Sequence, residues 1–178
     1  MKKLLLAMAV VVAALMSSCG GAKVEMDNPT DYEITVKIDG KKEYVVAPKE
    51  LIAVTGLKKG DHTMSVDGGP DIPFTFDGEY GAMLNPTLSL YVTDVTEYSE
   101  ISGNMDSSNW VTVEIDGDEY FGPIKVYENQ PIISFKGIHY GVLQDFPEEV
   151  DIRKSGSVFH TKLFRKGDFF KYYDEAYF

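Results

Sequence analysis

Alternating apolar and polar residues recur along much of the chain and predict β-strands. The clearest run, residues 32–38, carries an aromatic or β-branched residue at every second position, the period of a strand with one buried face. Asp39-Gly40 follows this run, and an Asp-Gly pair favours the positive φ angles of a tight hairpin turn. Further strands are expected at residues 44–46, 51–55, 62–66, 72–76, 88–98, 111–115, 121–127 and 131–136.

Helical periodicity is confined to the C-terminal end. Phe169, Tyr172, Tyr173 and Ala176 fall at positions i, i+3, i+4 and i+7, one face of a short amphipathic helix, and Asp168 is its expected N-cap. The pattern as a whole predicts a mainly β protein, an antiparallel β-sandwich with a short C-terminal helix. A pair of small β-modules packed together is the alternative form of this fold.

A polar segment at residues 99–109 interrupts the strand pattern and is interpreted as a linker or mobile loop. We therefore expect an N-terminal β-module at residues 24–98. A C-terminal β-module that carries the terminal helix is expected at residues 110–178.

Two short sequences occur twice. Residues 34–40 match residues 111–117 at an offset of 77, and this similarity fits either an internal duplication or the independent use of a good hairpin sequence. The tripeptide Asn-Pro-Thr occurs at residues 28–30 and 85–87, each time before a strand. Asparagine followed by proline is typical of a segment that starts a turn.

Residues 1–18 have the features of an export signal. Lys2 and Lys3 precede an apolar run at residues 4–15, and two small serines follow it. As a helix this run would span only about 18 Å, too short for a hydrocarbon core of about 30 Å. We therefore expect a cleaved signal peptide and no retained membrane span.

The chain has a single cysteine, Cys19, so it cannot form an intramolecular disulfide. Together with Leu15, Ser17 and Ser18, this cysteine resembles the lipobox of bacterial lipoprotein precursors. The resemblance implies cleavage before Cys19 and acyl chains, such as palmitate, on the cysteine. Since each buried methylene contributes about 0.8 kcal/mol, two or three chains would hold the protein stably in a membrane. Residues 19–23 would then form a lipidated tether.

The segment from Asn28 to Val66 resembles small exported bacterial β-modules of the PEGA type. The resemblance rests on Ile38-Asp39-Gly40 after a strand and on Gly60-Asp61-His62-Thr63 at the opening of another strand. Residues 84–88 and 162–173 resemble segments of uncharacterised bacterial envelope lipoproteins. These resemblances imply a role in the bacterial cell envelope and no known activity.

Acidic residues outnumber basic ones. Without Lys2 and Lys3, 15 basic residues stand against 28 acidic ones, a formal charge of −13 for the mature chain. Such a protein is repelled by phosphate backbones and by anionic head groups, which argues against nucleic acid as a partner and against electrostatic docking on a membrane. The lipid on Cys19 would therefore provide the membrane attachment.

Three histidines, His62, His139 and His160, are the side chains that ordinarily titrate near neutral pH. None lies in a catalytic motif, so we predict no catalytic residue and no cofactor, and a hydrolase is a distant alternative. His62 follows the apolar phase of its strand and is interpreted as a core or boundary histidine with its hydrogen bonds satisfied. The oxygen-rich turns at residues 67–77 and 116–119 lack the spacing of a calcium loop, so no metal site is predicted.

Aromatic residues are the better candidates for ligand binding. Tyr91, Trp110 and Tyr140 are selected, because aromatic rings on the polar phase of a strand can form a platform for sugars or for a protein partner. The predicted function is a non-enzymatic, membrane-anchored lipoprotein of the bacterial cell envelope that acts as a binding or scaffold module. The alternative is a carbohydrate-binding accessory lipoprotein of a glycan-uptake system.

Overall fold

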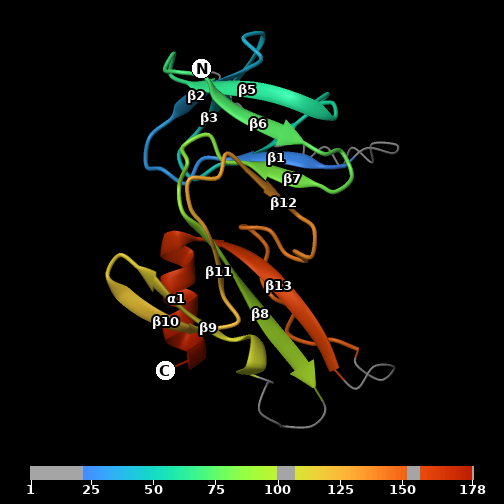
Figure 1. Cartoon of the computed structure of the whole chain (residues 1–178), viewed down its shortest axis with the longest axis vertical. Helices are drawn as coiled ribbons and strands as arrows, with labels where there is room; N and C mark the ends of the chain where they lie inside the picture. The colour runs from blue at the N-terminus through green and yellow to red at the C-terminus, as the bar shows by residue number, and fades with distance from the viewer. Residues whose placement is uncertain (1–21, 100–106, 152–156, 178) are drawn as a thin grey trace, which may run out of the picture.

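The computed structural model describes residues 22–99, 107–151 and 157–177. Three β-sheets stack on one another, and a β-hairpin together with the C-terminal helix covers the outer face of the third sheet (Figure 1). The fold is therefore mainly β, with sheets packed face to face and one short helix at the C-terminal end, as the sequence predicts. The expected signal peptide and Cys19 lie outside the described residues.

The first layer is a four-stranded antiparallel sheet. In spatial order its strands are β3 (Lys42–Val46), β2 (Ile34–Ile38), β5 (Gly60–Val66) and β6 (Ile72–Phe76). Ile34, Val36 and Ile38 are buried and alternate with more exposed residues, which confirms the predicted face. Asp39 and Gly40 turn the β2–β3 hairpin with φ angles of 52° and 62°, the predicted positive-φ turn.

The central layer is also four-stranded. In spatial order its strands are β12 (Ile132–Ser134), β7 (Ala82–Leu84), β1 (Val24–Asp27) and β4 (Leu51–Val54). β1 and β7 run parallel side by side, and the antiparallel β4 and β12 flank them. Met26 and Leu84 pack against the first layer, whereas Met83 and Ile133 pack against the third. Both faces are buried, so this sheet joins the two outer sheets.

The third layer is a three-stranded antiparallel sheet made of β11 (Lys125–Tyr127), β8 (Tyr91–Ser99) and β13 (Ser157–Arg165). β8 and β13 pair along their full length, from Tyr91 opposite Arg165 to Ser99 opposite Ser157. A 3₁₀ turn at Ser107–Asn109 leads into the hairpin of β9 (Val111–Ile115) and β10 (Asp118–Gly122). This hairpin and α1 (Lys166–Tyr177) cover the outer face around a core that includes Val92, Phe164 and Phe169.

Five strands of the first half recur in the same arrangement in the second half. We call β1 to β5 the first β-unit, and β7, β8, β11, β12 and β13 the second β-unit. In both units the first strand pairs with the fourth, and the second strand pairs with the third and the fifth. Ile34 begins β2 and pairs with Val46, the last residue of β3. Tyr91, 57 positions later, begins β8 and pairs with Tyr127, the last residue of β11. The two units therefore share their register as well as their strand order.

The repeat differs from the sequence match at an offset of 77. β9, which contains that match, pairs with β10 in a separate hairpin inserted between β8 and β11, and it is not the counterpart of β2. Asp116 and Gly117 turn this hairpin with φ angles of 56° and 91°. The shared sequence is therefore explained by a shared turn, whereas the Asn-Pro-Thr pair marks the true repeat at an offset of 57.

Strands of the two predicted modules pair with one another, and the module boundaries stay a prediction. β8, expected within residues 24–98, pairs in the third layer, and β12, expected within residues 110–178, returns to the central sheet. Alternation along a strand shows which face is buried but not which strand it pairs with. The sequence pattern alone therefore could not test a module boundary at residues 99–109. The helix begins at Lys166, which places Asp168 in its first turn and not at the N-cap.

Candidate functional site

A buried polar network joins the central and third layers. Asp27, at the end of β1, is 0% exposed and faces the third layer. Arg165 donates from Nε to Asp27 Oδ2 at 2.9 Å and from Nη2 to Asp27 Oδ1 at 2.5 Å. The Tyr91 hydroxyl donates to Asp27 Oδ2 at 2.7 Å. Three donors thus converge on one carboxylate in the interior of the protein.

The charges of this network stabilise one another. A buried carboxylate is costly unless it is paired and hydrogen-bonded, and the bidentate arginine together with the tyrosine meets both conditions. The hydrogen bond to Asp27 raises the pKa of Arg165 against the opposing effect of burial. Burial, followed by the nearby Asp27 charge, raises the pKa of Tyr91 far above its usual range. Tyr91 therefore remains a protonated donor and Arg165 remains a cation.

Arg165 also lines a cleft of about 630 Å³. Its Nη2 donates to the Lys49 carbonyl oxygen at 2.9 Å, which ties the cleft to the loop between β3 and β4. We call this feature the inter-unit cleft, because both β-units contribute to it. Its lining residues are Pro29, Lys49, Ser89, Leu90, Arg165, Lys166, Gly167, Asp168 and Lys171.

Two buried asparagines hold the turns that form part of the cleft wall. Asn28 Nδ2 donates to the carbonyls of Tyr32 at 2.8 Å and Val46 at 3.0 Å. Asn85 Nδ2 makes the corresponding bonds to Ser89 at 2.8 Å and Gln130 at 3.0 Å. Both asparagines are 0% exposed, so their amides replace the water that would otherwise satisfy these carbonyls. The Asn-Pro-Thr turns were predicted, and the structure adds that they meet at the cleft.

The cleft concentrates positive charge in an acidic protein. Four of its lining residues are basic and one, Asp168, is acidic, whereas the whole chain has a formal charge of −11. Lys49 Nζ lies 3.0 Å from Asp31, and Lys166 Nζ lies 2.8 Å from Asp116. The ammonium of Lys171 has no hydrogen bond or ion pair with any residue in the described part of the chain.

Tyr91 is not on an exposed face, which corrects the expectation from the strand phase. It is 0% exposed, because β8 is covered on one side by the central sheet and on the other by α1. A strand buried on both faces loses the in-out alternation on which the expectation depended. Tyr91 therefore offers no ring surface to a sugar, and its contact is with Asp27.

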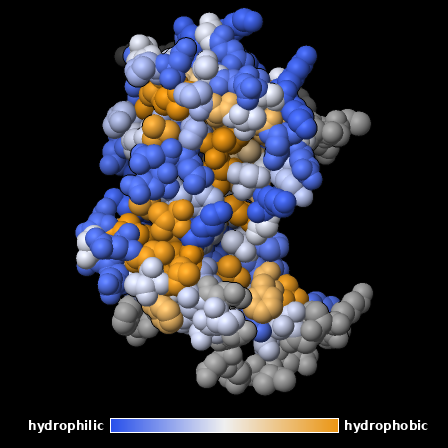
Figure 2. Space-filling model, in the orientation of Figure 1, coloured by the Kyte–Doolittle hydropathy of each residue, from blue (hydrophilic) through white to orange (hydrophobic). Residues whose placement is uncertain are grey.

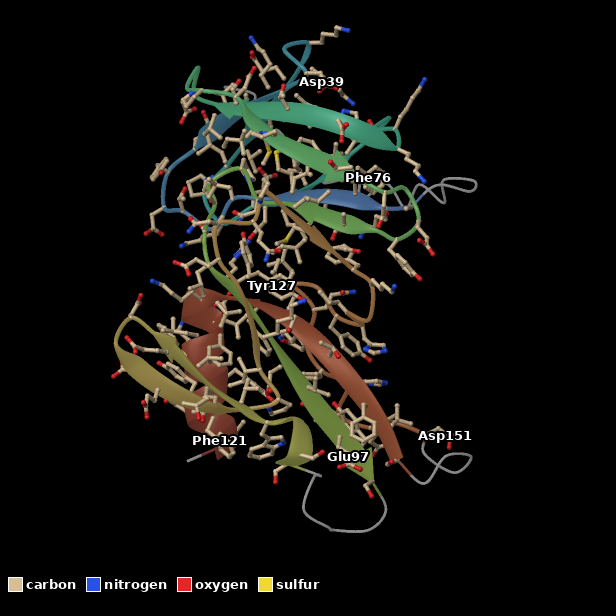
Figure 3. The ribbon with its side chains drawn as sticks, viewed as in Figure 1. Asp39, Phe76, Glu97, Phe121, Tyr127 and Asp151 are labelled. Carbon is tan, nitrogen blue, oxygen red and sulfur yellow. The ribbon has the colours of Figure 1, made fainter. Side chains whose placement is uncertain are left out.

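Trp110 and Tyr140 are half-buried and lie in two other clusters. The Trp110 ring meets Phe121 edge-on with 5.2 Å between centroids, and Phe121 is 51% exposed at the end of the hairpin (Figure 3). The Tyr140 hydroxyl lies 3.2 Å from His160 Nδ1, and its ring contacts Phe146. The structure does not bring the three predicted aromatic residues together. Their ligand-binding role stays a prediction for Trp110 and Tyr140.

The histidines differ in their surroundings. His62 Nδ1 lies 2.8 Å from Asp39 Oδ2, and its Nε2 lies 2.8 Å from the Lys58 carbonyl oxygen. Both partners are hydrogen-bond acceptors, which favours the form of the ring that carries two protons. Burial lowers the pKa of His62, but the bonds to Asp39 and to the Lys58 carbonyl outweigh it and raise the pKa overall. Burial and then the neighbouring His139 lower the pKa of His160.

Two aspartates of the oxygen-rich turn at residues 67–77 accept hydrogen bonds from backbone amides. Asp67 Oδ1 accepts from the Thr35 amide at 2.8 Å, and Asp77 Oδ1 accepts from the Glu79 amide at 2.8 Å. Within the described ranges, no group of three or more histidine, cysteine, aspartate or glutamate residues is placed to hold a metal ion. No helix in those ranges is long and apolar enough to cross a membrane.

Sequence reasoning missed Asp27 and Arg165. Asp27 follows Val24-Glu25-Met26 and Arg165 lies between Leu163-Phe164 and Lys166, so other charges stand close to both in the sequence and neither residue is marked out locally. Their separation of 138 residues hides the pairing. Comparison of the chain with protein-family models, curated proteins and solved structures finds no match. The geometry of the cleft therefore carries the functional argument.

Proposed function

We propose that this protein is a non-enzymatic lipoprotein of the bacterial cell envelope that acts as a binding or scaffold module. Acyl chains on Cys19 would anchor it, and the inter-unit cleft would be its binding site. One observation carries the second part: a cleft of about 630 Å³ lined by Arg165, whose guanidinium is paired with the buried Asp27. This volume lies within the range of ligand pockets, about 300 to 1,000 Å³.

The chemistry of the lining supports binding over catalysis. The basic lining residues are three lysines and an arginine, side chains that donate hydrogen bonds to an anionic or polar ligand. The Tyr91 hydroxyl behind them is also held protonated. Groups of this kind recognise and orient a ligand. Of the lining residues, Asp168 alone carries a carboxylate of the kind that could act as the general base in hydrolysis.

The position of the cleft fits an anchored protein. Val24 begins β1 directly after the proposed tether, and Asp27 ends the same strand beside the cleft. β1 is a central strand of the middle sheet, with β7 and β4 on its two sides. A ligand would therefore approach the end of β1 that is remote from the lipid.

Intact mass and membrane fractionation of the full chain test the anchor. We expect the wild type to be membrane-bound, cleaved before Cys19 and heavier than the unmodified mature chain by its acyl groups. Cys19→Ser should be soluble and unacylated, whereas Ser18→Ala, which keeps a small residue before the cysteine, should behave as the wild type. A soluble, unmodified wild type would refute the anchored lipoprotein.

A carbohydrate-binding accessory role is the second candidate. It is favoured by the exposed ring of Phe121 against Trp110, with Val111 of the same hairpin 44% exposed. Apolar side chains are visible on the half of the surface that carries α1 and this hairpin (Figure 2). A glycan array read with the wild type, Trp110→Ala and Phe121→Ala tests it. Binding that both substitutions abolish would favour this role, and an array without any signal would remove it.

A further inference from the structure

We infer that the inter-unit cleft binds an oxyanion, a carboxylate or phosphate group at the end of a larger ligand, through Arg165 and Lys171. This inference deepens the proposed binding function and rests on it. The two residues belong to different elements, the end of β13 and the middle of α1, and both line the cleft.

Arg165 has one guanidinium nitrogen that the protein does not use. Nε and Nη2 donate to Asp27 and to the Lys49 carbonyl, but Nη1 makes no hydrogen bond to any described residue. Fully buried side-chain nitrogen and oxygen atoms without a hydrogen-bond partner do not include Nη1 of Arg165. Nη1 is therefore accessible, and Arg165 lines the cleft. Its two protons are therefore available to a ligand.

The bonds to Asp27 also fix the orientation of this donor. A guanidinium held by two bonds to a buried carboxylate cannot swing away, so little further side-chain entropy is lost when a ligand binds. Asp27 neutralises the Arg165 charge in part, but it approaches the Nε and Nη2 side and leaves the Nη1 side open. The planar donor group is thus pre-organised for an oxyanion.

Lys171 of α1 supplies a second cation to the cleft. Gly167 and Lys171 lie four residues apart on α1 and so share a face of the helix, and both line the cleft. A Cβ placed on Gly167 would meet no atom within 4 Å, so the space in front of this face is open. Lys171 has no hydrogen bond or ion pair with a described residue, so its ammonium is available to a ligand.

The cleft is larger than one oxyanion. Pro29 and Leu90 add apolar surface to the polar lining. A small ion such as phosphate would therefore contact only part of the site, and the natural ligand would carry its anionic group at one end of a larger body. Because the whole chain is acidic, the attraction is local and should weaken as salt is added.

Calorimetric titration of the lipidated full chain in uncharged detergent tests the inference. The probes are succinate, inorganic phosphate and succinamide, the last of which matches succinate in shape but has no charge. We expect succinate, phosphate or both to bind and succinamide not to bind. The affinity should fall between about 50 and 300 mM salt, because the Debye length shortens from about 14 to about 6 Å. Binding of only one of the two anions would support the inference and identify the source as carboxylate or phosphate.

Matched variants locate the site. Lys171→Gln should weaken anion binding by about tenfold, the effect of one charge-assisted hydrogen bond. Lys41→Gln removes an exposed lysine from the β2–β3 turn and should leave the affinity unchanged. Gly167→Phe should place a ring in the cleft and abolish binding, because Gly167 lines the cleft and an added Cβ there meets no atom within 4 Å. The thermal midpoint of this variant checks that the fold is kept.

The outcomes separate this inference from the proposed function. Equal losses for Lys171→Gln and Lys41→Gln would show non-specific attraction and would overturn the site. Binding of succinamide as tight as that of succinate would overturn the oxyanion but keep the cleft as a binding site. If neither anion bound at millimolar concentration, the oxyanion inference would be refuted. The anchored lipoprotein would not be affected, because it is tested separately by the membrane fractionation and intact mass of Cys19→Ser.

Discussion

The two β-units share their strand order and register, but they meet the central sheet with different chemistry. Leu84 in β7 occupies the position that Asp27 has in β1, and Ile34 in β2 occupies the position that Tyr91 has in β8. On the side of the first β-unit, Leu84 and Ile34 pack in an apolar core. On the side of the second, Asp27 and Tyr91 meet Arg165 in a polar network. The same arrangement of strands therefore packs on the central sheet either with an apolar core or with a buried charged network.

This difference suggests what the polar network is for. A buried ion pair is a weak source of stability, because desolvation offsets the attraction between its charges. The apolar counterpart shows that the fold does not need one at this place. The second β-unit also carries the additions, α1 and the β9–β10 hairpin, and the network lies where α1 joins the sheet (Figure 1). The charges thus occur where the proposed ligand site is built.

The largest expected effect comes from breaking the network on one side. Arg165→Met leaves the Asp27 carboxylate buried without its cation, so we expect a loss of about 3 to 5 kcal/mol of unfolding free energy. Urea unfolding measures it. The double variant Asp27→Leu with Arg165→Met copies the chemistry of Leu84 and should recover most of the loss. A single variant that costs less than about 1 kcal/mol would show that water already reaches Asp27.

The next prediction tests the shared framework. Asn28→Ala and Asn85→Ala each remove an amide that satisfies buried carbonyls, so we expect losses of about 2 to 3 kcal/mol in both units. Gln130→Ala, which removes an exposed amide side chain, is the control and should change stability by less than about 0.5 kcal/mol. A large loss for one asparagine and none for the other would contradict the equivalence of the two turns.

Sequence patterns predicted the elements but not their partners. The alternation at residues 34–38 and the Asp39-Gly40 turn are confirmed, because each depends only on neighbouring residues. Tyr32 was expected on the buried face, but it precedes β2 and is 61% exposed. Tyr91 was assigned to an exposed face because Leu88, Leu90 and Val92 alternate with it, yet β8 is buried on both faces. The candidate site was beyond local reasoning.

The reason lies in the distances along the chain. Asp27 and Arg165 are 138 residues apart, and no periodicity connects them. The two Asn-Pro-Thr tripeptides mark the repeat, whereas the match at residues 111–117 fits the independent use of a hairpin sequence, one of the two alternatives that the sequence left open. A hairpin sequence is similar wherever a hairpin is needed, whereas a buried asparagine turn depends on its surroundings.

A smaller effect compares equivalent positions directly. Tyr91→Phe removes the hydroxyl bond to Asp27 but leaves both arginine bonds, so we expect a loss of about 1.5 kcal/mol. Ile34→Val at the equivalent position removes one buried methylene and should cost about 1 kcal/mol. Repeating Tyr91→Phe in the Asp27→Leu, Arg165→Met background isolates the hydroxyl. A loss that persists there would show that the hydroxyl acts through something other than Asp27.

The smallest effect is a difference in sign between two histidines, one in each unit. The pKa of His62 is raised overall, so its contribution to stability is complete below its usual pKa of 6.5 and is lost as the pH rises through the folded value. The pKa of His160 is lowered, so its contribution is complete above 6.5 and is lost as the pH falls. Between pH 7.5 and 5.5 the two effects oppose each other, and each is expected to be less than about 1 kcal/mol, because both side chains lie near the surface.

Single substitutions separate the two histidine effects. In His62→Gln the urea midpoint should fall more steeply, relative to the wild type, as the pH drops from 7.5 to 5.5, because only the His160 effect remains. In His160→Gln the midpoint should instead rise over the same interval, because protonated His62 keeps its bonds to Asp39 and Lys58. Slopes of the same sign in both variants would contradict the opposite directions of the pKa shifts of His62 and His160.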